Sequence, residues 1–250
     1  MKIAAGVVCL LFLAGPRPQD PAVRMALKKF EDDFYRNGAK PDQKIQAIIG
    51  LAIHKNEHVV KALTPVLTRE VSSSVRIVAA RELARFTAVP QAGQAVLAAF
   101  RNMANGGNKY SAVRIMLLRG LGELRVKEAA PDVDRCIEDR NVWVAKAAVD
   151  AAGKIRNRSS VDAMIGALKR IEGPMGDVQV AMNPLIDAFK EVTIGGLLGA
   201  DGNERATSER DFLRQPINEA LRAITRVPYT SSKEWDGWWK ANKAGFEVKE

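Results

Sequence analysis

The 250-residue sequence has few of the side chains on which disulfides and catalytic sites depend: two cysteines, two histidines and 6% aromatic residues. If an N-terminal export segment is removed, Cys136 is the only cysteine left, and a single mature chain then forms no internal disulfide. We expect Cys136 to be a small buried residue on a helix. No constellation of serine, cysteine or carboxylate residues indicates nucleophilic or acid–base catalysis. We therefore predict a protein that is not an enzyme and needs no cofactor.

The two histidines, His54 and His58, would share one face of a continuous helix and could then ligate a metal ion. The residues between them, Lys55, Asn56 and Glu57, are typical of a turn between two helices, however, and no third ligand is nearby in the sequence. The glutamate that directly follows the first histidine of a zinc-protease motif is also missing. We therefore expect no metal site.

A glycine-rich stretch at residues 195–202 is a second candidate for ligand binding. It is not followed by the lysine and serine or threonine pair of a phosphate-binding loop, and it does not alternate oxygen ligands as a calcium loop does. We expect the segment 195–209 to be a loop insertion, with a partner-binding loop as the alternative.

The N-terminus is typical of an export signal. A short positive start precedes an uncharged apolar run over residues 3–14, which residues 15–17 end. Twelve residues are too few to span a bilayer but suit the apolar part of a signal peptide. We predict a signal peptide at residues 1–15, a periplasmic or secreted protein, and no transmembrane domain. Bulky side chains near the end of the run leave the cleavage point open, so a retained signal that anchors the protein is the alternative.

The sequence is strongly basic, with a formal net charge of +9 and a pI near 9.7. This excess favours anionic partners such as phosphate, acidic polysaccharide, acidic protein surfaces or a membrane surface. It carries no information about the fold.

What the sequence has in quantity is an internal repeat. Residues 75–86, 113–124 and 144–155 align on an initial valine, with small or aliphatic residues four and five positions later and apolar residues at eight and eleven. Positions 0, 4, 8 and 11 lie on one face of a helix. Residues 44–52 form an earlier, less regular copy. At position nine each of the three copies has a small residue that would let a neighbouring helix approach closely: Ala84, Gly122 and Gly153.

Second helices lie between these copies, so each repeat is predicted to be a helical hairpin. No segment shows the sustained alternation of a strand. An amphipathic helix over 22–36 precedes the hairpins, and a short helix over 233–242 ends the chain. We expect one continuous array over 21–226 and a tryptophan-rich cap over 227–250. The hairpins are predicted at about 41–69, 73–104, 110–139, 141–172 and 177–226.

The pattern Val-Arg-x-x-Ala-Ala-x-x-Leu-Ala/Gly occurs at 75–84 and, in a related form, at 113–122. Asp139 matches the acidic turn that often precedes the first helix of such a repeat. On these residues the chain resembles the HEAT-repeat superfamily, and the Trp-x-x-Trp-Trp motif at 235–239 is similar to the closing segment of exported bacterial HEAT-repeat proteins. The resemblance implies an all-α fold, a right-handed α-solenoid of about five HEAT-like hairpins with capping helices at both ends. It also implies a scaffold or binding role, with no fixed ligand and no shared catalytic residues.

Arginines recur at equivalent positions of two repeats, Arg76 with Arg114 and Arg81 with Arg119. Because equivalent positions of stacked repeats form a ladder on one surface, these four residues are a candidate surface for an anionic partner. The alternative is that their stems pack on the helices and their guanidinium groups pair with carboxylates of the turns, such as those around Asp139.

Trp235, Trp238 and Trp239 form the strongest aromatic cluster, at helical spacing. An exposed face of this kind would be a binding hot spot. An open solenoid end needs its last hydrophobic groove covered, however. We expect a structural cap in which Trp235 and at least one of the other two lie against a helix at 211–226, with a partner-binding face as the alternative.

Together these features predict a non-catalytic scaffold that mediates protein–protein interaction outside the cytoplasm. A binder of polyanions or nucleic acid that uses a basic solenoid surface is the alternative. The third hypothesis is a DNA-repair enzyme on a HEAT-like scaffold, which would need an aromatic and carboxylate cluster in a basic groove.

Overall fold

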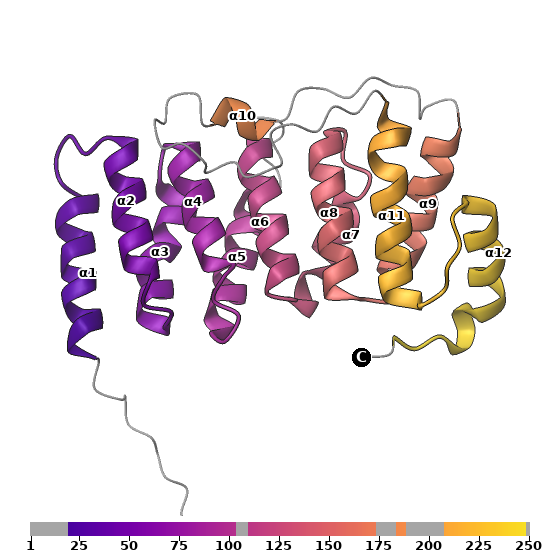
Figure 1. The fold of residues 1–250 in the computed structure, drawn as a ribbon, viewed down its shortest axis with the longest axis horizontal. Helices are drawn as coiled ribbons and strands as arrows, with labels where there is room; N and C mark the ends of the chain where they lie inside the picture. The colour runs from indigo at the N-terminus through magenta and orange to yellow at the C-terminus, as the bar shows by residue number, and fades with distance from the viewer. Residues whose placement is uncertain (1–19, 104–109, 174–183, 189–207, 249–250) are drawn as a thin grey trace, which may run out of the picture.

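The computed structural model describes residues 20–103, 110–173, 184–188 and 208–248. Helices take up 77% of these residues, and none of them lies in a strand. The helices stand side by side in a row that follows the chain from α1 to α12 (Figure 1). The all-α solenoid expected from the repeats is therefore confirmed. No helix in these ranges is both long enough and apolar enough to span a bilayer.

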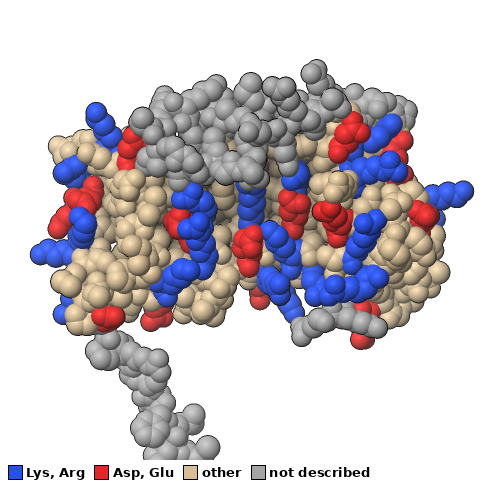
Figure 2. All heavy atoms as spheres, viewed as in Figure 1, with Lys and Arg blue, Asp and Glu red and all other residues tan. Residues whose placement is uncertain are grey.

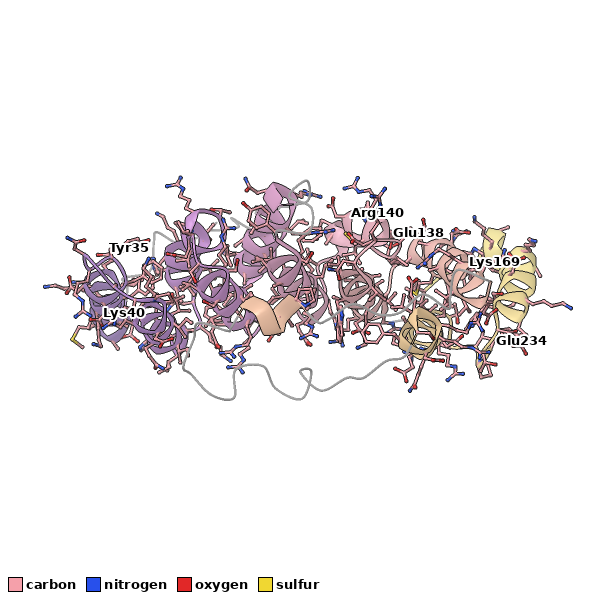
Figure 3. The ribbon with its side chains drawn as sticks, turned by 90° about the horizontal axis from the view of Figure 1, so that it is seen from above. Tyr35, Lys40, Glu138, Arg140, Lys169 and Glu234 are labelled. Carbon is pink, nitrogen blue, oxygen red and sulfur yellow. The ribbon has the colours of Figure 1, made fainter. Side chains whose placement is uncertain are left out.

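The array has two layers, which separate when it is seen from above (Figure 3). Neighbours in the first layer pack on one another in the order α2, α4, α6, α8 and α11. The second layer pairs α3 with α5, α7 with α9, and α9 with α12. The first layer consists of α2 (Pro41–Ala52), α4 (Ser73–Leu83), α6 (Ser111–Glu123), α8 (Val142–Ile155) and α11 (Glu209–Thr225). The second consists of α3 (Glu57–Arg69), α5 (Pro90–Met103), α7 (Ala130–Cys136), α9 (Ser160–Glu172) and α12 (Ser232–Asn242).

Four short or terminal elements complete the described part of the fold. Helix α1 (Pro21–Phe34) packs on α2 and begins the row, and the one-turn helix α10 (Pro184–Ala188) lies against α6. Two 3₁₀ turns precede α7 and follow α12, at Lys127–Ala129 and Lys243–Gly245.

Side-chain caps set the start of several helices. The Asn56 side chain accepts hydrogen bonds from the backbone N–H groups of His58 and Val59, which fixes the turn between α2 and α3. Asn141 caps α8 in the same way, and Ser231 forms a capping box with Glu234 at the start of α12. The hydrogen bonds from Ser231 and the Thr230 backbone lower the pKa of the exposed Glu234 carboxyl. Short polar side chains thus divide the apolar repeats into separate helices.

Close approach of first-layer helices depends on two glycines. A Cβ atom on Gly122 would lie 2.8 Å from the Cα of Ala151, so α6 and α8 touch through their backbones. A Cβ on Gly153 would lie 3.0 Å from the Cβ of Ala220, which gives α8 and α11 the same kind of contact. The small residues at position nine of the repeats therefore have the packing role that their spacing indicated.

The hairpin predicted for 177–226 lies only partly within the described residues. Most of the first helix expected there, residues 177–194, lies outside the described residues, and α11 takes the first-layer place beside α8. The chain then runs back along α11, because Asn218 donates to the carbonyl of Thr230 at 3.1 Å and Arg222 to that of Tyr229 at 3.3 Å. As a result α12 runs antiparallel to α9, not to α11 (Figure 1).

The turns lie along two opposite edges of the row. Turns from the first layer to the second, at residues 53–56, 84–89, 124–126 and 156–159, lie along the lower edge in Figure 1, where α11 also ends. Turns from the second layer to the first, at residues 70–72 and 137–141, lie along the upper edge. We call these the lower edge and the upper edge below. The predicted signal peptide and the glycine-rich stretch 195–202 lie outside the described residues.

Candidate binding surfaces

Arg114 is buried, with 6% of its surface exposed, and it forms an ion pair inside the array. Its Nη2 donates to the Oδ2 of Asp139 at 2.5 Å, and the other carboxylate oxygen of Asp139 accepts from the backbone N–H of Asn141. Burial alone would lower the pKa of Arg114, but the hydrogen bond and charge of Asp139 outweigh it and raise the pKa. The pair ties α6 to the turn between α7 and α8.

Arg76, at the equivalent position of the preceding repeat, is also buried. Its guanidinium donates to the backbone carbonyl of Thr68 near the end of α3 and lies over the ring of Tyr110, 5.5 Å from the ring centroid. Both arginines thus point from a first-layer helix to the C-terminal end of a second-layer helix. This position lies beneath the adjoining turn and not on a surface.

The structure places Arg76 and Arg114 inside the array, so the four arginines Arg76, Arg81, Arg114 and Arg119 do not form one exposed row. Two of the four are buried, Arg81 is bound to Glu82 at 2.7 Å, and Arg119 is partly buried with an interaction inside the chain. The alternative, in which the stems pack and the guanidinium groups pair with turn carboxylates, describes Arg114. Cys136 lies beside it, 3.6 Å from Arg114 Nη2, and burial raises the pKa of this thiol.

Two of the three C-terminal tryptophans are buried in the end of the array. Trp235 is fully buried and its Nε1 donates to the side-chain oxygen of Asn218 on α11 at 2.8 Å. Trp239 is 4% exposed and donates to Asp162 on α9 at 2.8 Å. Trp238 is partly exposed and packs edge-on against Phe246. These rings cover α9 and α11. Their positions support a structural cap rather than a partner-binding face.

The histidines fall on separate elements. His54 follows α2, and His58 lies in the first turn of α3. Across the described ranges, no group of three or more histidine, cysteine or carboxylate side chains is placed to hold a metal ion.

An open hollow lies between α1 and α2, at the left end of the row in Figure 1, and has a volume of about 510 Å³. We call it the α1–α2 groove. Its lining residues recur every three or four positions on both helices, so each helix contributes one face. They are Ala26, Lys29, Phe30, Asp33 and Arg36 from α1 and the residues after it, and Gln43, Gln46, Ala47, Gly50, Leu51 and His54 from α2 and the turn after it.

The floor of the groove is apolar and its rim is polar. Phe30 and Leu51 are both buried, each with 2% of its surface exposed. A Cβ atom on Gly50 would meet nothing within 4 Å, so this glycine opens directly into the hollow. On the rim, Lys29 pairs with Asp33 at 2.9 Å. Sequence reasoning found both helices but not the groove, and the small residues Ala47 and Gly50 on one face of α2 were the available signal.

Comparison with known proteins locates the repeats. A family model described as HEAT repeats matches residues 107–173. This segment contains the stacked helices α6, α7, α8 and α9, whose small-residue contacts and turn ion pair are described above. Residues 107–173 are therefore similar to HEAT repeats, and the described helices form an all-α solenoid around them. No curated protein and no solved structure matches it significantly. HEAT repeats are generally scaffolds for protein interaction and are typically non-catalytic.

Proposed function

We propose that this protein is a non-catalytic scaffold outside the cytoplasm that binds a helix of a protein partner in the α1–α2 groove. The observation that carries the proposal is the groove itself. It combines a volume of about 510 Å³ with a floor made by Phe30 and Leu51 and an open position at Gly50. Concave sites with an apolar floor and a polar rim are the usual form of a binding site.

A helix is the occupant that suits this geometry. The groove is bounded by two helices whose lining residues repeat at helical spacing, which is the surface into which the side-chain ridge of another helix packs. In helix-in-groove recognition an amphipathic helix lays its apolar face on such a floor and keeps its polar face at the rim. The uncharged Gln43 and Gln46 on α2 offer hydrogen-bonding groups to that polar face.

Blocking the groove should abolish capture of the partner. Gly50→Trp places a large ring where no atom lies within 4 Å, and it also removes a helical glycine, which disfavours helix by about 1 kcal/mol relative to alanine. We expect the variant to keep its helical circular dichroism and melting temperature. In affinity purification from native extract with quantitative mass spectrometry, we expect it to lose the proteins that the wild type retains.

Gly237→Trp is the matched control. Gly237 lies on α12, is exposed, and also has nothing within 4 Å of the place where a Cβ atom would lie. This variant adds the same ring to a helix at the other end of the row, so it should retain the same proteins as the wild type. Equal retention by Gly50→Trp and the wild type would refute the groove as the binding site.

The location outside the cytoplasm rests on the N-terminal sequence. A positive start, an uncharged run over residues 3–14 and a break at residues 15–17 are the features of a signal peptide. Mass spectrometry of the N-terminus, on protein purified from its native cell, should find a chain that begins close to residue 16 in an extracytoplasmic fraction. Intact Met1 on protein confined to the cytoplasm would contradict export.

A further inference from the structure

Basic side chains recur in every turn of the lower edge. Each of the four turns carries at least one, and Arg226 follows α11 at the same edge. Figure 2 shows Lys and Arg gathered toward the lower ends of α6, α8 and α11. The six residues are Lys55, Arg85, Arg125, Arg156, Arg158 and Arg226.

Three of these arginines have a backbone conformation that favours glycine. Arg125, Arg156 and Arg226 follow α6, α8 and α11 with φ angles of 48°, 57° and 67°. They are the positive-φ residues other than glycine among the described residues. A helix commonly ends on a glycine in this left-handed region because a side chain with a Cβ is strained there. The same strained residue type at three successive first-layer helices indicates that the side chain has a role of its own.

The charge of this edge is not shared with the opposite one. The upper-edge turns 70–72 and 137–141 hold three acidic residues and one arginine, and Figure 3 labels Glu138 and Arg140 in the second of them. One of the carboxylates there is in an ion pair, because Glu70 pairs with Lys44 at 2.9 Å. The turns of the lower edge contain no acidic residue. The described turns of the two edges therefore differ in the sign of their charge.

The side chains at two of the strained positions are available to a partner. Arg125 and Arg226 are exposed, and within the described ranges neither side chain makes a hydrogen bond or ion pair. Arg85 pairs with Glu82 at 3.0 Å but keeps 62% of its side chain exposed. Stacked helices are spaced by about 8–10 Å, so the cations that follow successive first-layer helices recur along the lower edge at roughly that interval.

We propose that the lower edge binds an acidic polysaccharide, whose carboxylate or sulfate groups pair with the row of arginines. The planar fork of a guanidinium suits oxyanions of this kind, which accept two parallel hydrogen bonds. A linear polymer with an anion on successive units matches cations that follow one another along a line. This binding surface is separate from the α1–α2 groove and goes beyond the proposed protein scaffold.

The aromatic residues of the edge favour a polysaccharide over nucleic acid. Proteins that bind single strands combine a basic track with exposed aromatic rings on which bases stack. The aromatic residue in the four turns, Phe86, is 1% exposed. Tyr229, after α11, packs edge-on against Trp235 with ring centroids 5.4 Å apart. The lower edge therefore offers charge and hydrogen bonds without a stacking platform.

The test removes the strained arginines without removing the conformation they adopt. In the triple variant Arg125→Gly, Arg156→Gly, Arg226→Gly the new residue is the one that the positive φ favours, so the melting temperature should be unchanged or higher. The matched control, Arg24→Gln, Lys28→Gln, Lys61→Gln, removes three exposed cations from α1 and α3. Both are compared with the wild type for binding of a size-fractionated heparin fragment across a series of salt concentrations.

We expect the arginine variant to bind heparin about tenfold more weakly, which corresponds to a modest contribution from each substituted arginine, with the exposed Arg125 and Arg226 contributing most. The slope of log affinity against log salt should fall by up to about one for each lost contact. The control should stay within about twofold of the wild type. An equal loss in both variants would show a response to net charge alone and overturn the proposal, as would unchanged binding by the arginine variant. Tighter binding of a single-stranded oligonucleotide than of heparin at equal charge would also overturn it, in favour of nucleic acid.

Discussion

Trp235→Ala should lower the free energy of unfolding by about 3–5 kcal/mol, the usual cost of truncating a large buried aromatic side chain. The ring of Trp235 is fully buried and packs edge-on against Tyr229 and Trp238. Truncation would also leave the oxygen of Asn218 without the indole donor that it binds at 2.8 Å. Urea denaturation followed by circular dichroism measures the change.

Two further variants separate the contributions of this site. Trp235→Phe keeps an apolar ring but removes the indole N–H, so it should destabilise the protein by less than the alanine variant. Trp238→Ala alters a neighbour that is already partly exposed and should also cost less. Limited proteolysis of Trp235→Ala should cleave within α11 or α12 first, because the ring joins these two helices. If Trp235→Ala unfolds at the same urea concentration as the wild type, the tryptophans do not cap the array.

Asp139→Asn should cost about 2–4 kcal/mol, because it leaves the buried guanidinium of Arg114 without its counter-charge. Removing one partner of a fully buried pair typically costs 3–5 kcal/mol, and we expect somewhat less here since 17% of the Asp139 side chain is exposed. The asparagine oxygen can still accept a hydrogen bond from the backbone N–H of Asn141. The variant therefore removes the negative charge but can keep the hydrogen bond that holds the turn. Urea unfolding curves give the difference.

An exposed pair provides the comparison. Lys29 and Asp33 form an ion pair at 2.9 Å with 79% and 43% of their side chains exposed, and Asp33→Asn should change stability by less than about 1 kcal/mol. In the double variant Arg114→Met, Asp139→Asn no unpaired charge remains buried, so part of the loss should be recovered. If Asp139→Asn costs no more than Asp33→Asn, the pair does not hold α6 to the turn after α7.

The repeated helices could be predicted because their signal is local. Residues 75–86, 113–124 and 144–155 show their apolar spacing within a single helix, and they correspond to α4, α6 and α8. The glycines at position nine could be predicted as well, since a missing side chain on a buried face indicates a close neighbour. The contact of Gly153 with Ala220 satisfies that expectation with α11, a helix far along the chain.

Which helix stacks on which could not be read from the same pattern. The sequence pattern suggested a first helix at 177–194, whereas α11 takes the first-layer place beside α8. Arg76 and Arg114 were correctly aligned with each other, but alignment does not tell whether a position faces solvent or the end of a neighbouring helix. The cations that are exposed at the lower edge lie in turns, where the repeat pattern ends. An arginine in the sequence does not indicate that its backbone adopts the left-handed conformation.

Photo-cross-linking from the α1–α2 groove tests whether the protein is a scaffold whose partner binds there. A photoreactive amino acid is placed at Gly50, which opens into the groove, or at Gly237, which is equally open on α12. After irradiation in the native cell, we expect a discrete protein adduct from position 50 whose cross-linked peptide is helical in its own protein, and no matching adduct from position 237. The same adducts from both positions, or none from position 50, would contradict binding in the groove.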